Sequence, residues 1–381
     1  MYNTISVSPD ISWDNISRRV YGLPDRAGEI AKLNNYINSG EVLYYVEEKS
    51  TEQTNQILLK VGENNFTDFA EYRLFEGLEC FKGAVFVIDN INTDIKNGDS
   101  VTILDKDGMF LCGLVRNTKP AFNSEHNWLQ VEIKTFAGFL AESHINKEQL
   151  ESNNLSIKDV FSKILDGFGI KYQFSNDAVF SEIFTNSIGT GFSADIQETA
   201  YNFLKRICKS RNLVMKDTGD GLFFGKIDTN QNTKLNLIDN ESIGIHSATA
   251  SFCTVGLGRN YEINTQFPTV STTRTITPLT FPVLRRFSSA DFNGEDVSSP
   301  QKIAATEIGE NFSIIYEIST DIPIRSGDIV SVKDGRILIS TETDFIVETV
   351  ERVDNDRSFI HLVLPCKYTG KLPKELPACR F

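Results

Sequence analysis

The 381-residue sequence has few of the residues on which metal sites, disulfides and membrane spans depend. It contains 4 His and 6 Cys, and none of them fall at CxxC, HxxxH or HxH spacing. A zinc site is therefore not expected, and we interpret the cysteines as reduced and mostly buried. The best apolar run, 81–88, is much shorter than a membrane helix and already contains Lys82. Residues 1–10 have neither a basic nor an apolar signal region, so we expect no signal peptide.

Basic residues are also scarce relative to acidic ones. The chain has 38 Lys+Arg against 51 Asp+Glu, which gives a formal net charge of −13. This excess of negative charge argues against a protein whose whole surface binds nucleic acid or an anionic membrane. Trp and Met are rare, at 2 and 3 residues, whereas Phe reaches 27, and an aromatic-rich, Met-poor composition favours β structure. At about 150 residues per domain, the length predicts two or three domains.

Residues 1–48 have the pattern of a small strand–helix–helix–strand module. We expect a first strand over 4–7, a helix capped by Ser12 and ended at Gly22, a second helix over 25–33 and a last strand over 42–46. A polar linker, 49–55, follows. The apolar residues expected to form the core of the module are Trp13, Ile16, Val20, Ile30 and Leu33.

Alternating apolar residues dominate the next region, 56–150, and predict a small closed or nearly closed β-barrel. Its hairpin turn is Asp105-Lys106-Asp107-Gly108. This turn lacks the further ligands and the terminal Glu of a calcium loop, so we interpret it as a turn only. The expected strands are 56–61, 70–75, 83–88, 101–104, 109–115 and 128–135.

Helical periodicity appears in the region 151–235, which we interpret as an α+β domain. A helix should begin after Ser156 and end at Gly167, and a second should run over 194–211 with Ser193 as its cap. A hairpin with its turn at 217–221 follows. Gly189-Thr190-Gly191 lacks the Lys-Ser/Thr of a phosphate-binding loop, so turn geometry explains it better.

Two distant segments of the chain form an internal sequence repeat. Residues 95–103 (IKNGDSVTI) match residues 324–332 (IRSGDIVSV), and each segment follows an alternating strand and precedes an Asp-Gly hairpin, at Asp107-Gly108 and Asp334-Gly335. We therefore predict two copies of one barrel, with equivalent turns at Gly98-Asp99 and Gly327-Asp328. The second copy would occupy 236–368, followed by a tail over 369–381. Convergent turn chemistry is the alternative explanation.

Three segments of the first module resemble the LysM module and the LysM-type tail proteins of contractile phages: SWDNISRRVYG (12–22), IAKLNN (30–35) and GEVLYYV (40–46). In this sequence Ser39-Gly40-Glu41 replaces the Pro-Gly that usually precedes the last strand, which affects the glycan-binding loop of the family. A generic βααβ cap is the alternative. The fold class we predict is mainly β with an α+β insertion: two similar small β-barrels plus a helix-containing domain, preceded by a small βααβ LysM-like domain.

The order of segments over about 55–368 resembles the central baseplate hub proteins of contractile phage tails and the hub part of type VI secretion spike proteins. The segments that carry the resemblance are 57–88, IKNGDSVTI (95–103), VEIKTFAGFLAES (131–143), 192–227 and the repeat with its flank, 322–350. The resemblance implies a homotrimer whose two barrels per chain form a ring of six around a delivery channel. Such a ring adapts the six-fold tail tube to the three-fold spike, and the N-terminal module would contact sheath or baseplate wedge proteins.

The same resemblance implies a structural protein of the virion tail baseplate, assembled in the host cytoplasm. It implies no enzymatic activity, no catalytic, cofactor-binding or metal-binding residues, no cofactor, no sequence-specific binding of nucleic acid and no membrane insertion. A genome or an effector would pass through the channel.

Two other classes of protein remain as alternatives. A LysM-bearing peptidoglycan-degrading tail protein would need a catalytic group such as a carboxylate pair, and a stand-alone adhesin would bind glycan through residues 1–50. Acidic residues cluster twice, and we interpret both clusters as solvated faces rather than catalytic pairs. The clusters are Glu71, Glu76 and Glu79, and Asp217 and Asp220.

Overall fold

The computed structural model divides the chain into two compact units, Met1–Gln56 and Ile57–Phe381. Among the described residues, no helix combines the length and the apolar character that crossing a membrane requires. The residues that the structure describes are 2–6, 42–46, 57–89, 94–122, 127–145, 155–182, 198–229, 231, 233–238, 244–252, 258–264, 271–275, 283–289, 300–319, 324–353 and 357–373.

In the first unit, strand β1 (Tyr2–Ser6) pairs antiparallel with strand β2 (Val42–Val46). Tyr2 lies opposite Val46 and Ser6 opposite Val42. The strand predicted over 42–46 is confirmed, and the strand predicted over 4–7 is found at 2–6. Its two helices, the residues of its expected core, the segment 39–41 and the linker 49–55 lie outside the described residues.

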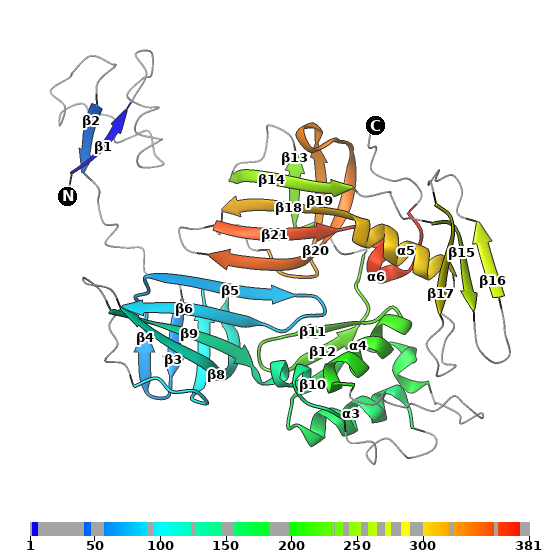
Figure 1. The fold of residues 1–381 in the computed structure, drawn as a ribbon, viewed down its shortest axis with the longest axis horizontal. Coiled ribbons are helices and arrows are strands. Elements are labelled where there is room, and N and C mark those ends of the chain that lie inside the picture. Colours follow the sequence, from blue (N-terminus) through cyan, green and yellow to red (C-terminus); the bar gives the residue numbers. More distant parts are fainter. Residues whose placement is uncertain are drawn as a thin grey trace. The chain divides into compact units, whose positions relative to one another are not determined.

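The first β unit comprises residues 57–135 and contains each strand expected there, although β8 runs on to Phe122 and β4 was not expected (Figure 1). Its strands alternate between buried and half-buried positions because one face of each strand covers the core of the unit. Gly108 starts the strand after the Asp105–Gly108 turn, which confirms that hairpin. The strands are β3 (Leu58–Val61), β4 (Asn64–Phe66), β5 (Glu71–Gly77), β6 (Gly83–Asp89), β7 (Ser100–Asp105), β8 (Gly108–Phe122) and β9 (Asn127–Thr135).

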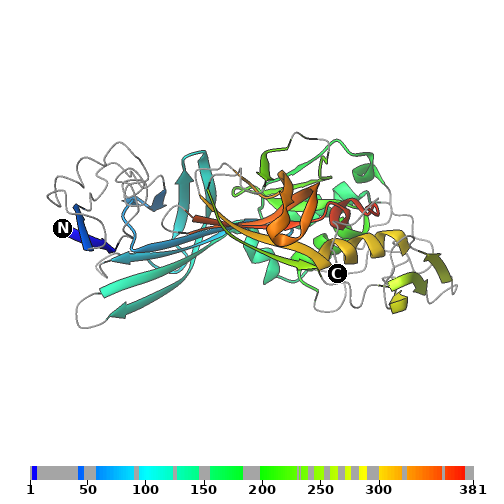
Figure 2. The same cartoon turned by 90° about the horizontal axis from the view of Figure 1, so that it is seen from above.

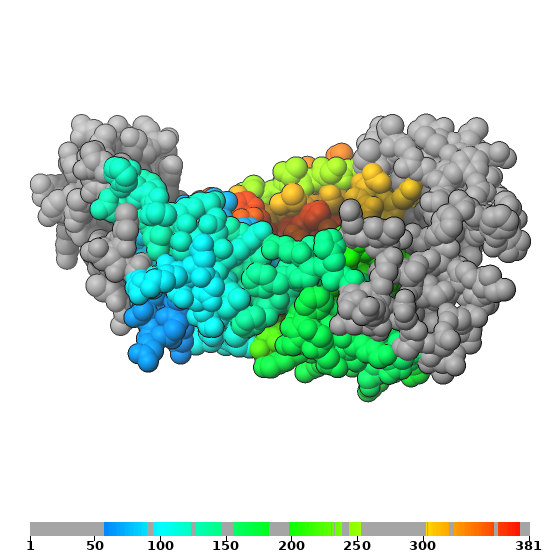
Figure 3. All heavy atoms as spheres, turned by 60° about the horizontal axis from the view of Figure 1, so that its bottom comes forward, coloured from blue at the N-terminus to red at the C-terminus, as the bar shows by residue number. Residues whose placement is uncertain are grey.

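The helical segment, 136–227, packs two helices against a three-stranded sheet of order β10-β12-β11. Helix α3 (Ile157–Gly167) begins as predicted, because the Ser156 hydroxyl accepts from the Asp159 N–H while the Asp159 carboxylate accepts from the Ser156 N–H. Figure 3 shows this segment, in green, beside the blue and cyan first β unit. The other elements are η2 (Phe136–Ala141), β10 (Tyr172–Phe174), η4 (Ala178–Ser181), α4 (Ala200–Ser210), β11 (Val214–Asp217) and β12 (Leu222–Gly225).

Helix α4 is shorter than predicted. Thr199 has extended backbone angles and caps the helix with its hydroxyl, which accepts from the Asn202 N–H. Thr199 also forms an isolated bridge to His144, and the Ala200 N–H donates to the Ser143 carbonyl. These contacts fix an extended backbone at Thr199, so a helix continuous from residue 194 is excluded. The predicted cap, Ser193, lies outside the described residues.

The second β unit comprises β13 (Leu235–Ile238), β14 (Ile245–Phe252), β18 (Phe312–Ser319), β19 (Ile329–Asp334), β20 (Ile339–Val353) and β21 (Arg357–Val363). The predicted hairpin at Asp334-Gly335 contains a short 3-10 turn, η5 (Gly335–Ile337). Helix α5 (Pro300–Asn311), which the sequence reasoning missed, precedes β18, and α6 (Cys366–Thr369) follows β21. A separate sheet of order β16-β15-β17 contains Ser271–Thr275, Gly258–Asn264 and Val283–Ser289.

The two β units share one strand order, because β6-β9-β8-β7 and β18-β21-β20-β19 pair in the same sequence. Their turns also make the same hydrogen bonds. The Gly98 N–H donates to the Val115 carbonyl at 2.8 Å and the Gly327 N–H to the Val347 carbonyl at 2.8 Å. The predicted equivalence of the two Gly-Asp turns is confirmed. Two rows of paired residues cross the units at equivalent positions: Leu74, Ala84, Ile133 and Val115, and Ala250, Ile314, Leu362 and Val347.

The predicted barrels are not closed within the described part of the chain. All strands of both β units belong to one 13-stranded sheet whose main path runs from β14 to β4. Strand β5 could close the first unit only with its outer edge, but this edge pairs with the second half of β20, from Thr349↔Gly77 to Val353↔Arg73. Figure 2 shows the blue and teal strands of the first unit running into the orange strands of the second.

Candidate functional site

Charged side chains concentrate where the two β units and the helical segment meet. Glu76 lies on β5, Lys82 precedes β6, Asp105 ends β7 and Asp217 ends β11, and each of these side chains is less than a tenth exposed. Arg325 comes from the turn before β19 and Arg352 from β20. We call these six residues the ionic junction. It connects three parts of the chain, and its contact between Asp105 and Arg352 joins residues 247 positions apart in sequence.

Arg325 is the central cation of the ionic junction. Its guanidinium donates to Asp105 at 2.9 Å and to Asp107 at 2.8 Å, and lies 3.7 Å from the Glu76 carboxylate. Arg352 also donates to Asp105, at 2.7 Å. The hairpin turn of the first unit is therefore held by two arginines of the second.

Asp217 fixes the helical segment to the first β unit. Its carboxylate accepts hydrogen bonds from the Lys82 backbone N–H at 3.0 Å, the Thr135 hydroxyl at 2.6 Å and the Gly219 N–H at 2.7 Å. The turn that follows rests on β8, since the Cys112 N–H donates to the Gly219 carbonyl at 2.7 Å. Burial raises the pKa of Asp217, although these three donors oppose the rise.

The charges of the ionic junction shift one another's pKa values. Burial would raise the pKa of Asp105, but the hydrogen bonds and positive charges of Arg325 and Arg352 outweigh it and lower that pKa. Burial lowers the pKa of Lys82, and the neighbouring Glu76 carboxylate opposes the fall. The junction is thus a set of mutually compensating charges.

Two of the acidic residues that we interpreted as solvated are buried. Glu76 is 3% exposed and Asp217 is 1% exposed. The correction has a physical reason: each carboxylate is compensated by donors that come from distant parts of the chain, Ser326 for Glu76 and Thr135 for Asp217. No short-range pattern contains these partners, so the sequence could not reveal them. Glu71 matches the interpretation, with a side chain 50% exposed.

The Asp105 turn engages its carboxylates with arginine rather than leaving them for a cation. Within the part of the chain that the structure describes, no cluster of three or more His, Cys, Asp or Glu could hold a metal ion. The segment Gly189–Gly191 lies outside those residues. Of the four cysteines whose surroundings are described, Cys208 and Cys366 are buried and Cys80 and Cys112 half-buried, and all four are free thiols.

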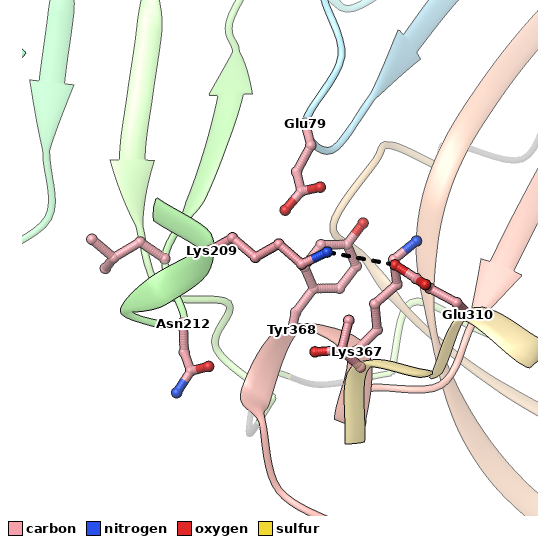
Figure 4. A pocket seen from close by; sticks show the side chains of 8 residues that line it. Glu79, Lys209, Asn212, Glu310, Lys367 and Tyr368 are labelled. Atoms are coloured by element: carbon pink, nitrogen blue, oxygen red, sulfur yellow. Dashed lines mark ion pairs between the residues drawn. The ribbon is translucent and has the colours of Figure 1, made fainter. Parts of the chain in front are cut away.

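A small cavity lies beside the junction, between α4, α5, α6 and the end of β5. Figure 4 shows the ion pair between Lys209 and Glu310, whose atoms lie 3.8 Å apart, with the side chains of Glu79 and Tyr368 beside it. The cavity offers about 20 Å³, room for one or two water molecules.

Glu348 forms a second, partly buried ionic group close to this cavity. It lies in a bulge of β20, 3.0 Å from His361 Nδ1, and accepts hydrogen bonds from Lys367 and, at 2.7 Å, from the Tyr368 hydroxyl. Burial would raise its pKa, but these partners outweigh it and lower the pKa to about 2. Both ionic groups thus connect strands to neighbouring elements.

The chain has a recognisable architecture: two copies of one β unit are separated in sequence by an α+β segment. Pairing of β5 with β20 joins the two copies into one sheet. No protein-family model matches the sequence, and no curated protein matches it.

Solved structures do share the fold. The 43 kDa tail protein of prophage MuSo2 from Shewanella oneidensis is 16% identical, with a TM-score of 0.70 over 82% of this chain and 99% of that one. The tail protein from Neisseria meningitidis MC58 is 13% identical, with a TM-score of 0.69 over 83% of this chain and 98% of that one. A type VI secretion component of E. coli, described as similar in structure to phage T4 tail proteins gp27 and gp5, is 11% identical, with a TM-score of 0.53 over 81% and 76%. The chain therefore has the fold of phage tail proteins.

Proposed function

We propose that the chain is the structural baseplate hub of a contractile phage tail or a related injection machine. The observation that carries the proposal is the duplicated β unit, whose two copies share strand order, turn hydrogen bonds and bulges. With two equivalent units per chain, three chains would present six equivalent units to a six-fold tube. The three chains themselves would match the symmetry of a three-fold spike. The fold shared with tail proteins over four-fifths of the chain supports the same role.

The trimer would enclose the delivery channel as a closed ring of six β units, which replaces the two separate barrels expected from the sequence. Three chains carry a formal charge of −39, three times the −13 of one chain. A basic channel would bind a passing genome, whereas an acidic or neutral one would repel it from every side. We therefore expect few basic residues on the channel wall. The protein would be part of the virion tail and act without catalysis.

The N-terminal module would bind a protein neighbour, such as sheath or wedge subunits, rather than glycan. The alternative, a cell-wall-binding or peptidoglycan-degrading tail protein, predicts that the full chain sediments with purified peptidoglycan or digests it. Absence of both activities, with the chain folded, would favour the hub.

The deciding experiment is the mass of the full chain in solution, by size-exclusion chromatography with light scattering. A hub predicts about 128 kDa, three chains of 42.7 kDa, and negative-stain images with a central opening. A monomer at all concentrations tested, or a closed dimer, would contradict the trimeric ring.

A further inference from the structure

Several strand edges of the large sheet have no partner within the described part of the chain, and two of them, on β14 and β8, are the counterparts of strands that pair inside the chain. Strand β14 is the last strand of the sheet path and pairs only with β18. The outer half of β8, residues 116–122, pairs with β9 on one side, but β7 pairs only with residues 108–114 and leaves the other side open. Exposed backbone edges of this kind are sites where another strand can add.

These two edges correspond to the two strands that already pair inside the chain. The outer half of β20, residues 349–353, is the counterpart of the outer half of β8. Each half follows a bulge, which comes after Val347 in β20 and after Val115 in β8. Strand β14 is the counterpart of β5, because they pair with β18 and β6 at equivalent registers. Inside the chain, the outer half of β20 pairs with β5. The same contact, repeated, would join β14 to the outer half of β8.

We propose that β14 of one copy pairs antiparallel with the outer half of β8 of the next copy. The inference rests on the proposed function, in which several copies form one ring. It identifies the strands that pair between neighbouring copies and the register of that pairing. Glu351 lies opposite Phe75 inside the chain, and their counterparts are Lys119 and Ser251. The pairs between copies are Thr118 with Phe252, Lys119 with Ser251, Pro120 with Ala250 and Ala121 with Thr249.

Phe122 supports this partner for the β8 edge. It ends β8 and is 79% exposed, more than any other large apolar side chain among the described residues. In the proposed register it lies opposite Ala248, on the side of β14 where Ala250 and Phe252 pack against the second core. The neighbouring copy would therefore cover an apolar surface that a single chain leaves in water.

The contact between copies would differ chemically from the one inside the chain. In the first unit, Glu76 and Lys82 form a buried ion pair at 3.5 Å. The second unit has Phe252 and Phe312 at the counterpart positions, with ring centroids 5.5 Å apart. An aromatic pair at the edge makes the contact between copies less sensitive to salt than an ionic one.

Pro120 limits this contact in a defined way. The Val115 N–H and carbonyl both point away from β9, toward Asp99 and Gly98. The alternation of the ladder then places the backbone groups of Thr118 and Pro120 on the open edge as well. Proline has no N–H, so the contact has one fewer hydrogen bond than its internal counterpart. A proline on an open edge also discourages unspecific strand addition before assembly.

The test is a disulfide between copies of the full-length chain. Lys119 and Ser251 are both exposed in the single chain. In the proposed register they form a non-hydrogen-bonded antiparallel pair, whose Cα atoms lie about 4.5 Å apart, within disulfide reach. A 1:1 mixture of the Lys119→Cys and Ser251→Cys variants should give a covalent dimer on oxidation. The matched control replaces Ser251→Cys with Ser247→Cys, which shifts the partner by about 13 Å along the strand. The unmodified chain controls for the native cysteines.

A dimer in the mixture that is at least ten times more abundant than in either control supports the pairing. In addition, Phe122→Ser should raise the concentration for half-assembly at least tenfold and leave the melting temperature of the unassembled chain unchanged. Oligomers of the expected mass that lack this cross-link would overturn the strand pairing and leave the hub proposal standing. A chain that stays monomeric, with no cross-link, would overturn both. Cross-linked oligomers of another size would support the pairing and contradict the three-fold ring.

Discussion

Arg116 and Glu348 occupy the same bulge of the two β units and carry opposite charges. Arg116 pairs with Glu132 on β9, at 3.2 Å, and with Glu142 beyond η2, at 2.7 Å. Glu348 pairs with His361, the counterpart of Glu132 on β21, and with Lys367 of α6. In each unit the bulge residue therefore contacts a side chain of the neighbouring strand and one at or after the following short helix. The bulge residue is an arginine in the first unit and a glutamate in the second.

The Glu348 group should make stability depend on pH. The folded-state pKa is lowered to about 2 from 4.5, so the stabilisation is complete above about pH 4.5 and is lost as the pH falls toward 2. Glu348→Gln should lower the free energy of unfolding by about 3 kcal/mol at pH 6 and by almost nothing near pH 2. Urea unfolding of both proteins across this range measures the gap. A gap that is constant with pH would contradict the assignment.

Removal of the central cation of the ionic junction should be costly. Arg325→Ala removes one of the two cations that face Glu76 and one of the two that face Asp105, and breaking a buried ion pair costs about 3–5 kcal/mol. Because Arg325 is 28% exposed, we expect the lower end of this range, measured by chemical unfolding. Lys171→Ala is the matched control, since Lys171 is 74% exposed in its pair with Asp220 and should cost about 0–1 kcal/mol. Equal losses would show that the junction is not stabilising.

Gly219 should tolerate no side chain. Its φ is +97°, and a Cβ would lie 2.2 Å from the Phe110 carbonyl oxygen on β8. Gly219→Ala therefore combines backbone strain with a clash against a buried strand. Gly62→Ala, at φ +58° with nothing within 4 Å, has only the strain of about 1–2 kcal/mol. We expect Gly219→Ala to lower the melting temperature at least twice as far, and similar shifts would contradict the contact with β8.

The equivalent turns should respond equally to the same change. The Asp99 carboxylate accepts from the Lys96 N–H at 2.7 Å, and the Asp328 carboxylate accepts from the Arg325 N–H at 2.9 Å. Asp99→Ala and Asp328→Ala should each lower the free energy of unfolding by about 1–2 kcal/mol. The Asp→Asn variants keep an acceptor oxygen and should lose less. Losses that differ by more than about 2 kcal/mol would argue that the two turns are not energetically equivalent.

Local patterns in the sequence were enough for most strands of the first β unit, for the turns and for one helix start, but not for β4, β10 or the sheet of β15, β16 and β17. The Ser156 cap has its partner three residues away, and each Gly-Asp turn forms its carboxylate bond to a backbone N–H three residues earlier. Helix α5 was missed although Pro300 suits a first helical position and Ala304, Ala305 and Ile308 have helical spacing.

The site could not be predicted from local patterns. Burial of Glu76 and Asp217 depends on donors 250 and 82 residues away, and pairing of β5 with β20 depends on the position of two whole units. The closed barrels were wrong for the same reason, because strand alternation indicates which face is buried but not which edge finds a partner.

Strand β20 has a mechanical consequence. Its first half belongs to the ladder with β19 and its second half to the ladder with β5, and the Glu348 bulge separates them. A force that pulls the two β units along the strand direction must shear all five residue pairs of the β5 contact together, whereas a force across the strands opens them one after another. The chain should therefore resist sliding far better than peeling, and under load it should bend first at the bulge.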